Sequence, residues 1–174
     1  KRQVLSWANH PRALPLAVPA AVSQMAALRG MEVVVLRPEG FALPEPLMQK
    51  ALAAAAASGG SVTETDDREA ALAGAHVVYA KEWGSTAHYG DAAADAAQRA
   101  ALSGWTLEES WFAKSRADCR LMHCLPVRRN VAVADHLLDG PRSAVLAQAH
   151  NRLVVQRAVL HRLLAGRGRA AIAA

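Results

Sequence analysis

Short β-branched runs alternate along this chain with longer segments rich in alanine and leucine, and this alternation constrains the fold more than any other feature. The run at 31–36 (MEVVVL) is apolar almost throughout, which is typical of a strand buried on both faces of a parallel sheet. The pattern predicts strands at 4–8, 31–36, 61–64, 77–80 and 120–123. Strands that alternate with helices predict an α/β fold, with a doubly wound, Rossmann-like parallel sheet that carries helices on both faces.

The helical segments are bounded by residues that commonly start and stop helices. They are predicted at 20–28, 44–57, 66–73, 107–114, 134–138 and 151–164. Gly30 ends the first of them, a proline opens the second, and acidic residues open the third, where they suit the helix dipole. The last helix carries apolar residues on one broad side, namely Leu153, Val154, Ala158, Leu160 and Leu164. The segment 84–104 is polar and poorly periodic, so we expect a flexible loop there.

Composition argues against several classes of partner. The net charge is +5, but the arginines are scattered and no aromatic residues interleave with them, so no nucleic-acid partner is expected. No segment approaches the roughly 18 continuous apolar residues of a membrane span. Cys119 and Cys124 lack CxxC or paired-histidine spacing, which favours reduced thiols and a cytoplasmic location over a disulfide or a zinc site. Lys1 is not followed by a signal-peptide pattern, and we interpret the chain as one cut at a domain boundary or as an incomplete sequence.

Polar side chains gather just after the predicted strands and at the start of the last helix. They are His10, Lys81, Glu82, His123, Cys124, Arg128, Arg129, Asn151 and Arg152. In doubly wound sheets, ligands bind beyond the carboxyl ends of the strands. Any one of these residues alone is more often packed or solvated than functional, but together they predict a cationic crevice suited to phosphate or carboxylate ligands.

An alternative use of this cluster is nucleophilic catalysis, with Cys124 as an acyl-forming nucleophile and His123 as its base. Adjacent residues of a strand point to opposite faces, however, so this pairing is geometrically unfavourable. Other catalytic and phosphate-binding patterns are absent from the sequence, which has no G-x-G-x-x-G after a strand, no Walker A loop and no G-x-S-x-G elbow.

At 123–130 the sequence is HCLPVRRN, a highly specific string, and three other segments agree with it in order: HPRALPLAVP at 10–19, VVYAKEWG at 77–84 and NRLVVQ at 151–156. With these segments the chain resembles the aspartate/ornithine carbamoyltransferase family, in particular the enzymes for N-acetylornithine and N-succinylornithine. The resemblance assigns 1–174, including the C-terminal helix at 151–165, to the family's amino-acid-binding domain. The family's carbamoyl phosphate domain has no counterpart in this sequence.

The resemblance implies carbamoyl transfer from carbamoyl phosphate to the δ-amine of an Nα-acylornithine, in arginine biosynthesis, by a homotrimer that needs no metal or organic cofactor. Family members that use free ornithine carry an Asp where this chain has Lys81. An Asp suits the α-ammonium of free ornithine, whereas a Lys suits the carboxylate that remains once that amine is acylated. Lys81 therefore favours an acylated substrate and would bind its carboxylate.

The resemblance also implies a role for each of the other matched residues. His10 and Arg128 would contact the acylornithine. Cys124 and Leu125 would approach the carbamoyl group and the attacking amine, with the Leu125 carbonyl as an acceptor. Arg152 would bind the carbamoyl phosphate oxygen on which negative charge develops as the amine adds, a form of oxyanion stabilisation.

The resemblance further implies two backbone features. The Leu125–Pro126 peptide bond would be cis, which would aim the loop at the ligand. The loop near Lys81 would thread past the proline-rich loop at 10–16 and form a knot, a rare feature among folds. Ala132 stands where some acetylornithine enzymes carry a Lys.

The substrate is not decided by these motifs alone. The chain shares features with both the acetyl and the succinyl enzymes, so the acyl group stays open. An enzyme for free ornithine, which Lys81 disfavours, and a ligand-binding module without catalysis stay open as alternatives. By itself the chain is expected to be inactive, because only half of a carbamoyl phosphate site is present.

Overall fold

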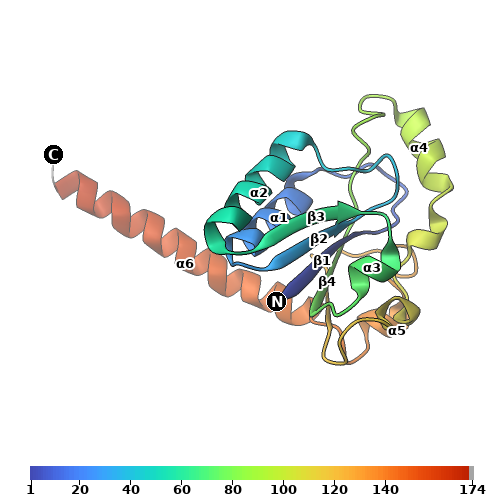
Figure 1. The fold of residues 1–174 in the computed structure, drawn as a ribbon. Helices are drawn as coiled ribbons and strands as arrows, with labels where there is room; N and C mark the ends of the chain where they lie inside the picture. Colours follow the sequence, from blue (N-terminus) through green and yellow to red (C-terminus); the bar gives the residue numbers. More distant parts are fainter. Residues whose placement is uncertain (173–174) are drawn as a thin grey trace.

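Five parallel strands form the centre of the computed structural model, which describes residues 1–172, with side chains through 165. They are β1 (Arg2–Trp7), β2 (Glu32–Leu36), β3 (Ser61–Thr65), β4 (Val77–Lys81) and β5 (Arg120–Met122). Their order across the sheet is β3-β2-β1-β4-β5, and every neighbouring pair is parallel (Figure 1). The chain thus starts in the middle of the sheet and winds outward first to one side and then to the other. The predicted fold class is confirmed.

The strands are apolar on both faces because the sheet is covered on both. In β1 and just beyond it, Val4 and Ala8 belong to the core on one face, whereas Leu5 and Trp7 belong to the core on the other. All four side chains are fully buried. This two-sided burial explains why the strands are continuous apolar runs without polar alternation.

Helices α1 (Ala17–Leu28) and α2 (Glu45–Ser58) pack together on one face of the sheet, and α3 (Arg68–Leu72) and α5 (Asp135–Leu138) lie on the opposite side (Figure 1). Asp67 caps α3 through its carboxylate, which accepts a hydrogen bond from the Ala70 amide at 3.0 Å. These helices lie within a few residues of the predicted segments, because their caps and breakers are local signals.

The prediction of a flexible loop at 84–104 is wrong, since this segment contains helix α4 (Ala92–Ala100) and a 3₁₀ turn at Ser103–Trp105. Asp91 caps α4 by accepting from the Ala94 amide at 3.0 Å. The helix has no apolar stripe because its buried residues are charged: Asp95 and Arg99 are 6% and 3% exposed and pair with each other. Apolar periodicity cannot detect a helix that is held by an ion pair.

The helix predicted at 107–114 is also largely wrong, because only a 3₁₀ turn at Glu109–Phe112 forms. Leu107 instead forms an isolated parallel bridge with Val133, in which the Leu107 amide donates to the Ala132 carbonyl at 2.9 Å. Trp111 and Phe112 then turn into the core beside α3. The tertiary bridge at Leu107 therefore overrides the local helical preference.

The last helix, α6 (Val145–Ile172), begins six residues before the predicted start at 151, because Val145–His150 consists mostly of good helix formers. Its first turns pack on β5, and the rest extends away from the body of the molecule (Figure 1). Asn151 and Arg152 therefore lie inside the helix and do not open it.

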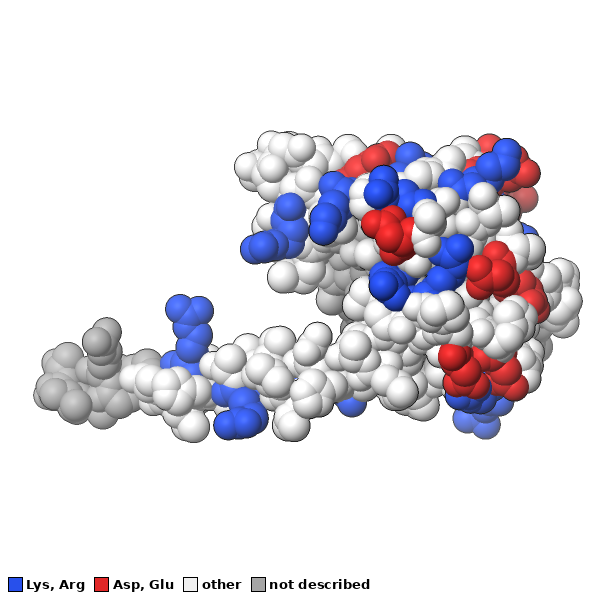
Figure 2. All heavy atoms as spheres, turned by 90° about the horizontal axis from the view of Figure 1, so that it is seen from below, with Lys and Arg blue, Asp and Glu red and all other residues white. Residues whose placement is uncertain are grey.

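The extended part of α6 exposes its apolar side chains. From residue 153 onward, its large apolar side chains are all more than half exposed, and their exposed fractions run from 51% for Val159 to 67% for Leu164. They are Leu153, Val154, Val155, Val159, Leu160, Leu163 and Leu164. Over residues 145–165 this helix contains arginines but no Asp or Glu, and most of its surface in Figure 2 is uncharged. Within 1–172, no helix is both long and apolar enough to span a membrane.

Candidate active site

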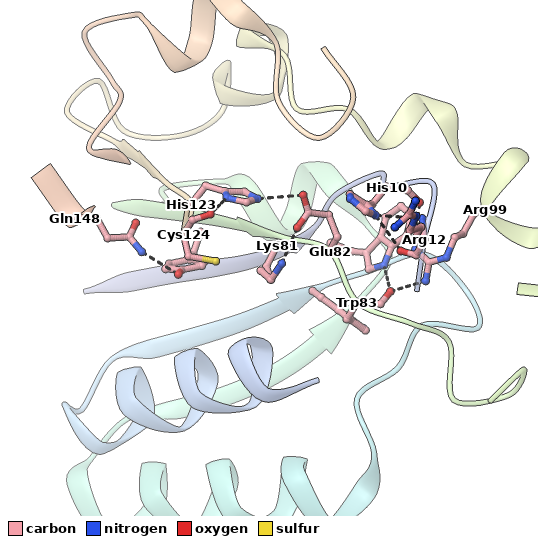
Figure 3. A network of polar contacts seen from close by, with 11 residues as sticks. His10, Arg12, Lys81, Glu82, Trp83, Arg99, His123, Cys124 and Gln148 are labelled. Atoms are coloured by element: carbon pink, nitrogen blue, oxygen red, sulfur yellow. Dashed lines mark hydrogen bonds and ion pairs between the residues drawn. The ribbon is translucent and has the colours of Figure 1, made fainter. Parts of the chain in front are cut away.

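The carboxyl ends of the three neighbouring strands β1, β4 and β5 bring most of the predicted polar residues to one edge of the sheet (Figure 3). The register pairs Trp7 with Lys81, and the Ala8 amide donates to the Lys81 carbonyl at 3.1 Å. His10 therefore lies just beyond the point where β4 delivers Lys81 and Glu82. His123 follows β5, the next strand across the sheet. The parallel order alone explains why residues so far apart in sequence meet here.

A buried charged cluster occupies the centre of this edge. The Lys81 ammonium donates to Glu82 Oε2 at 2.7 Å, and His123 Nε2 lies 3.2 Å from Glu82 Oε1 (Figure 3). The exposed fractions are 8% for Lys81, 2% for Glu82 and 0% for His123. Glu82 thus bridges the end of β4 and the end of β5 through its two carboxylate oxygens.

Glu82 is ionised in this environment. Burial by itself would raise the pKa of Glu82, but hydrogen bonds and charges from His123 and Lys81 outweigh it and lower the pKa from 4.5 to about 2. Glu82 was expected at this edge of the sheet, without a role. Its adjacency to Lys81 was visible, whereas its contact with His123, 41 residues away, depends on the sheet order.

Cys124 faces away from this cluster, toward a second polar group. Burial raises the pKa of Tyr79 to about 12, and the neighbouring Cys124 thiol adds to the rise, so Tyr79 is a neutral phenol. Gln148 of α6 donates to the Tyr79 oxygen at 2.9 Å. The His123 ring instead contacts the Cys124 carbonyl oxygen and Glu82. A Cys124–His123 nucleophile pair is therefore not formed, as the strand geometry predicted. Both cysteines are free thiols.

His10 is held in place by its own loop and by α4. Its Nδ1 lies 3.1 Å from the Arg12 amide nitrogen, which donates to it when that ring nitrogen is unprotonated. The Arg99 guanidinium donates to the Trp83 carbonyl at 2.9 Å and to the His10 carbonyl at 3.5 Å, while Asp95 neutralises it (Figure 3). Arg99 thus clamps the segments that follow β1 and β4. Arg99 was not among the predicted site residues, because α4 itself was not predicted.

The proline-rich loop and the segment after β4 lie in direct contact. The Gly84 amide donates to the Leu14 carbonyl at 2.9 Å, and a Cβ on Gly84 would lie 3.1 Å from the Ala13 Cβ. The side chains of 11–16 and of 84–96 surround a hollow of about 590 Å³ between these segments. The expected approach of the two loops is confirmed, and their threading into a knot stays a prediction.

The two arginines of the loop after His123, Arg128 and Arg129, differ in their contacts. Arg129 donates to Asp135 at 2.9 Å and to Asp139 at 2.7 Å, so it anchors the loop to α5. The neighbouring Arg128 is exposed, and no ion pair involves it among residues 1–165. The expected cis Leu125–Pro126 bond is confirmed. Leu125 is 36% exposed. Arg128 and Leu125 are thus available to a ligand, and Arg129 is not.

Arg152 is not brought into the cluster. It lies on α6 one helical turn after Gln148, so the two side chains share a face of the helix. Since Gln148 contacts Tyr79 beside Cys124, Arg152 lies one helical turn beyond this contact, and it is exposed. Ala132, in contrast, is fully buried in the core and offers no group to a ligand.

The described residues contain no cluster of three or more His, Cys, Asp or Glu side chains that could hold a metal ion. The cluster at the sheet edge instead combines cations with hydrogen-bonding groups. This arrangement can bind and orient an anionic ligand beside Cys124 and the loop that follows it.

Comparison with known proteins agrees with this chemistry. Residues 18–163 match the model of the aspartate/ornithine carbamoyltransferase family, Asp/Orn binding domain. An N-acetylornithine carbamoyltransferase of Xanthomonas campestris pv. campestris is 36% identical over 165 residues, covering 94% of this chain and 48% of that protein. An ornithine carbamoyltransferase of Methanoculleus marisnigri is 38% identical over 140 residues, covering 80% of this chain and 43% of that protein.

A solved structure of acetylornithine transcarbamylase in complex with acetylcitrulline superposes with a TM-score of 0.88 at 36% identity. The match covers 92% of this chain and 48% of that one. The chain therefore spans about half the length of the relatives it matches.

Proposed function

The chain belongs to the aspartate/ornithine carbamoyltransferase family, and we propose that it forms the amino-acid-binding half of an enzyme that carbamoylates the δ-amine of an Nα-acylornithine. The observation that carries the proposal is the buried Lys81 ammonium at the carboxyl edge of the sheet, within one cluster with the loop that bears Cys124 and Leu125. A cation suits a substrate whose α-nitrogen is uncharged and whose α-carboxylate remains.

In the proposed reaction, the neutral δ-amine attacks the carbonyl carbon of carbamoyl phosphate. A C–N bond forms, the C–O bond to phosphate breaks, and the proton that the amine loses passes to the departing phosphate. Lys81, His10 and Arg128 bind and orient the acylornithine, and the Leu125 carbonyl accepts a hydrogen bond from the attacking amine. Because two substrates are held in contact, alignment supplies much of the rate enhancement.

Cys124 and Arg152 act on the other substrate in this proposal. Cys124 lies just beyond β5 and beside Tyr79, and in this proposal a carbamoyl group meets the amine there. Arg152 would stabilise the oxygen that becomes negative as the tetrahedral intermediate forms. The exposure of Arg152 supports this role, because it leaves the guanidinium open to a second substrate.

The remaining half of the relatives' length would supply the rest of the carbamoyl phosphate site. The exposed apolar side chains of α6 support this division, since such a surface is usual where another domain packs. We further propose that the complete enzyme is a cytoplasmic homotrimer that serves arginine biosynthesis.

The second candidate function is carbamoylation of free ornithine. The ornithine carbamoyltransferase relative at 38% identity favours it. Lys81 argues against it, because the cationic α-ammonium of free ornithine would face a cation. A binding module without catalysis is the third possibility for the chain alone.

The test is an assay of the full-length product of the gene with N-acetylornithine, N-succinylornithine and free ornithine, each with carbamoyl phosphate. We expect an acylcitrulline to form fastest, and the faster of the two acylated substrates identifies the acyl group. Fastest turnover of free ornithine would overturn the argument from Lys81. Absence of turnover with all three would overturn the enzyme proposal. The isolated chain is expected to give no turnover.

A further inference from the structure

The hydrogen bonds of His123 define its charge. Nδ1 lies within hydrogen-bond distance of the Cys124 carbonyl oxygen, and Nε2 lies 3.2 Å from a carboxylate oxygen of Glu82. Both partners are acceptors, so each ring nitrogen must carry a hydrogen to form its bond. A histidine that donates from both nitrogens is an imidazolium. The alternative, a protonated Glu82 that donates to the ring, would leave the buried Lys81 ammonium, 2.7 Å from the other Glu82 oxygen, without a carboxylate partner.

We propose that Glu82 is a positioning residue that holds His123 as an imidazolium, so that the buried Lys81–Glu82–His123 cluster keeps one unbalanced positive charge for a single ligand carboxylate. The identity of that ligand rests on the function proposed above. The charge state of the cluster rests on the geometry alone and can be measured separately.

The cluster is short of one negative charge. Lys81 and His123 are cations that share one carboxylate, and among residues 1–165 no other carboxylate pairs with either of them. The side chains of Glu82 and His123 are 3% and 0% exposed, so water compensates the surplus charge poorly. An incoming carboxylate would complete the cluster, which explains how Lys81 can attract an anion although Glu82 already pairs with it.

This charge count selects a substrate class. An Nα-acyl amino acid presents one α-carboxylate and no α-ammonium, so it supplies the missing negative charge. Free ornithine brings the same carboxylate together with an α-ammonium beside two cations, which is repulsive. Glu82 therefore acts on specificity through its two neighbours, without contact with the substrate itself.

Glu82 also connects the ends of β4 and β5 mechanically. One of its oxygens holds Lys81 at the end of β4, and the other holds His123, which precedes Cys124 and Leu125. Replacement by glutamine keeps the shape but removes the charge and leaves only one acceptor oxygen. His123 then loses the anion that supports its second proton, and Lys81 loses its fixed position.

The test of the charge state is ¹⁵N NMR of the histidine rings in the 174-residue chain at neutral pH, with His123 assigned through ring-to-backbone correlations in the wild type. We expect two protonated ring nitrogens on His123 in the wild type and one in Glu82→Gln. Glu64→Gln serves as the matched control, since Glu64 pairs with Arg37 away from this cluster. A singly protonated His123 in the wild type would overturn the proposal, and that result does not depend on the folding of any variant.

The test of the ligand uses chemical-shift titration of the same chain with N-acetyl-L-ornithine and with its methyl ester, which lacks the carboxylate. We expect the wild type to prefer the acid, and Glu82→Gln to weaken binding of the acid about tenfold, as for the loss of a charge-assisted hydrogen bond. Binding of the ester should change little. Equal binding of the acid by wild type and Glu82→Gln would overturn the positioning role.

The two experiments separate the two proposals. If His123 is doubly protonated but the wild type binds neither compound, the proposed substrate is wrong and the role of Glu82 in the charge state stands. If the wild type prefers the acid while His123 is singly protonated, the substrate class stands and the inference about Glu82 is wrong.

Discussion

The stability of the chain should depend on pH through Glu82. The folded pKa of Glu82, about 2, lies below its usual value of 4.5. A depressed carboxyl pKa contributes stability that is present above the unfolded pKa and is lost as pH falls toward the folded pKa. At about 1.4 kcal/mol per pKa unit, the difference corresponds to about 3 kcal/mol, of which about 2 kcal/mol is lost by pH 3.

The measurement is urea denaturation of wild type and Glu82→Gln at a series of pH values from about 6 down to about 3. We expect Glu82→Gln to be less stable by about 3 kcal/mol at the upper end, and the gap to narrow as the wild-type carboxylate becomes protonated. Other carboxylates titrate in both proteins and cancel in the difference between the two profiles, which reports Glu82 together with its partner His123. Glu64→Gln controls for the loss of one paired carboxylate elsewhere. Two profiles that stay parallel across this range would refute the reasoning.

Three further predictions concern the site and its supports. In the full-length enzyme, Lys81→Gln should lower kcat/KM for the acylated substrate by about 100-fold, because a buried charged partner of the ligand is lost; steady-state kinetics would show this, and an unchanged value would remove Lys81 from the site. Arg99→Met should destabilise the chain by about 3 kcal/mol because it leaves Asp95 as an unpaired buried charge, and calorimetry with Arg116→Met as an exposed control tests it. Leu160→Ser should change the stability of the isolated chain by less than about 0.5 kcal/mol, since this side chain is 58% exposed; a larger loss in urea denaturation would show that α6 packs on the body.

Several parts of the site followed from local sequence. The apolar runs of the sequence predicted where each strand ends, so Lys81 and Cys124 were correctly placed at one edge of the sheet. The resemblance at HCLPVRRN implied the cis proline and gave a ligand contact to Arg128 and none to Arg129. In the structure Arg128 is exposed, whereas Arg129 is tied to Asp135 and Asp139. That distinction depends on where α5 lies relative to the loop.

Helix α4 shows the opposite case. Its Asp91 cap is a local signal, but its buried residues are Asp95 and Arg99, which periodicity methods treat as surface. A buried ion pair becomes recognisable only when the groups around it are known, here the carbonyls of His10 and Trp83. The error at 84–104 therefore concealed Arg99 as well as the helix.

The sequence by itself determined the class of fold and the residues at the sheet edge, because strand patterns, caps and short motifs act over a few neighbouring positions. Only the tertiary structure decided which of these residues act together. Glu82 meets His123 because β4 and β5 are adjacent, and this contact defines the charge of the cluster around Lys81. The net charge of a buried cluster depends on which side chains from different strands meet, and a sequence pattern over a few neighbouring positions does not specify them.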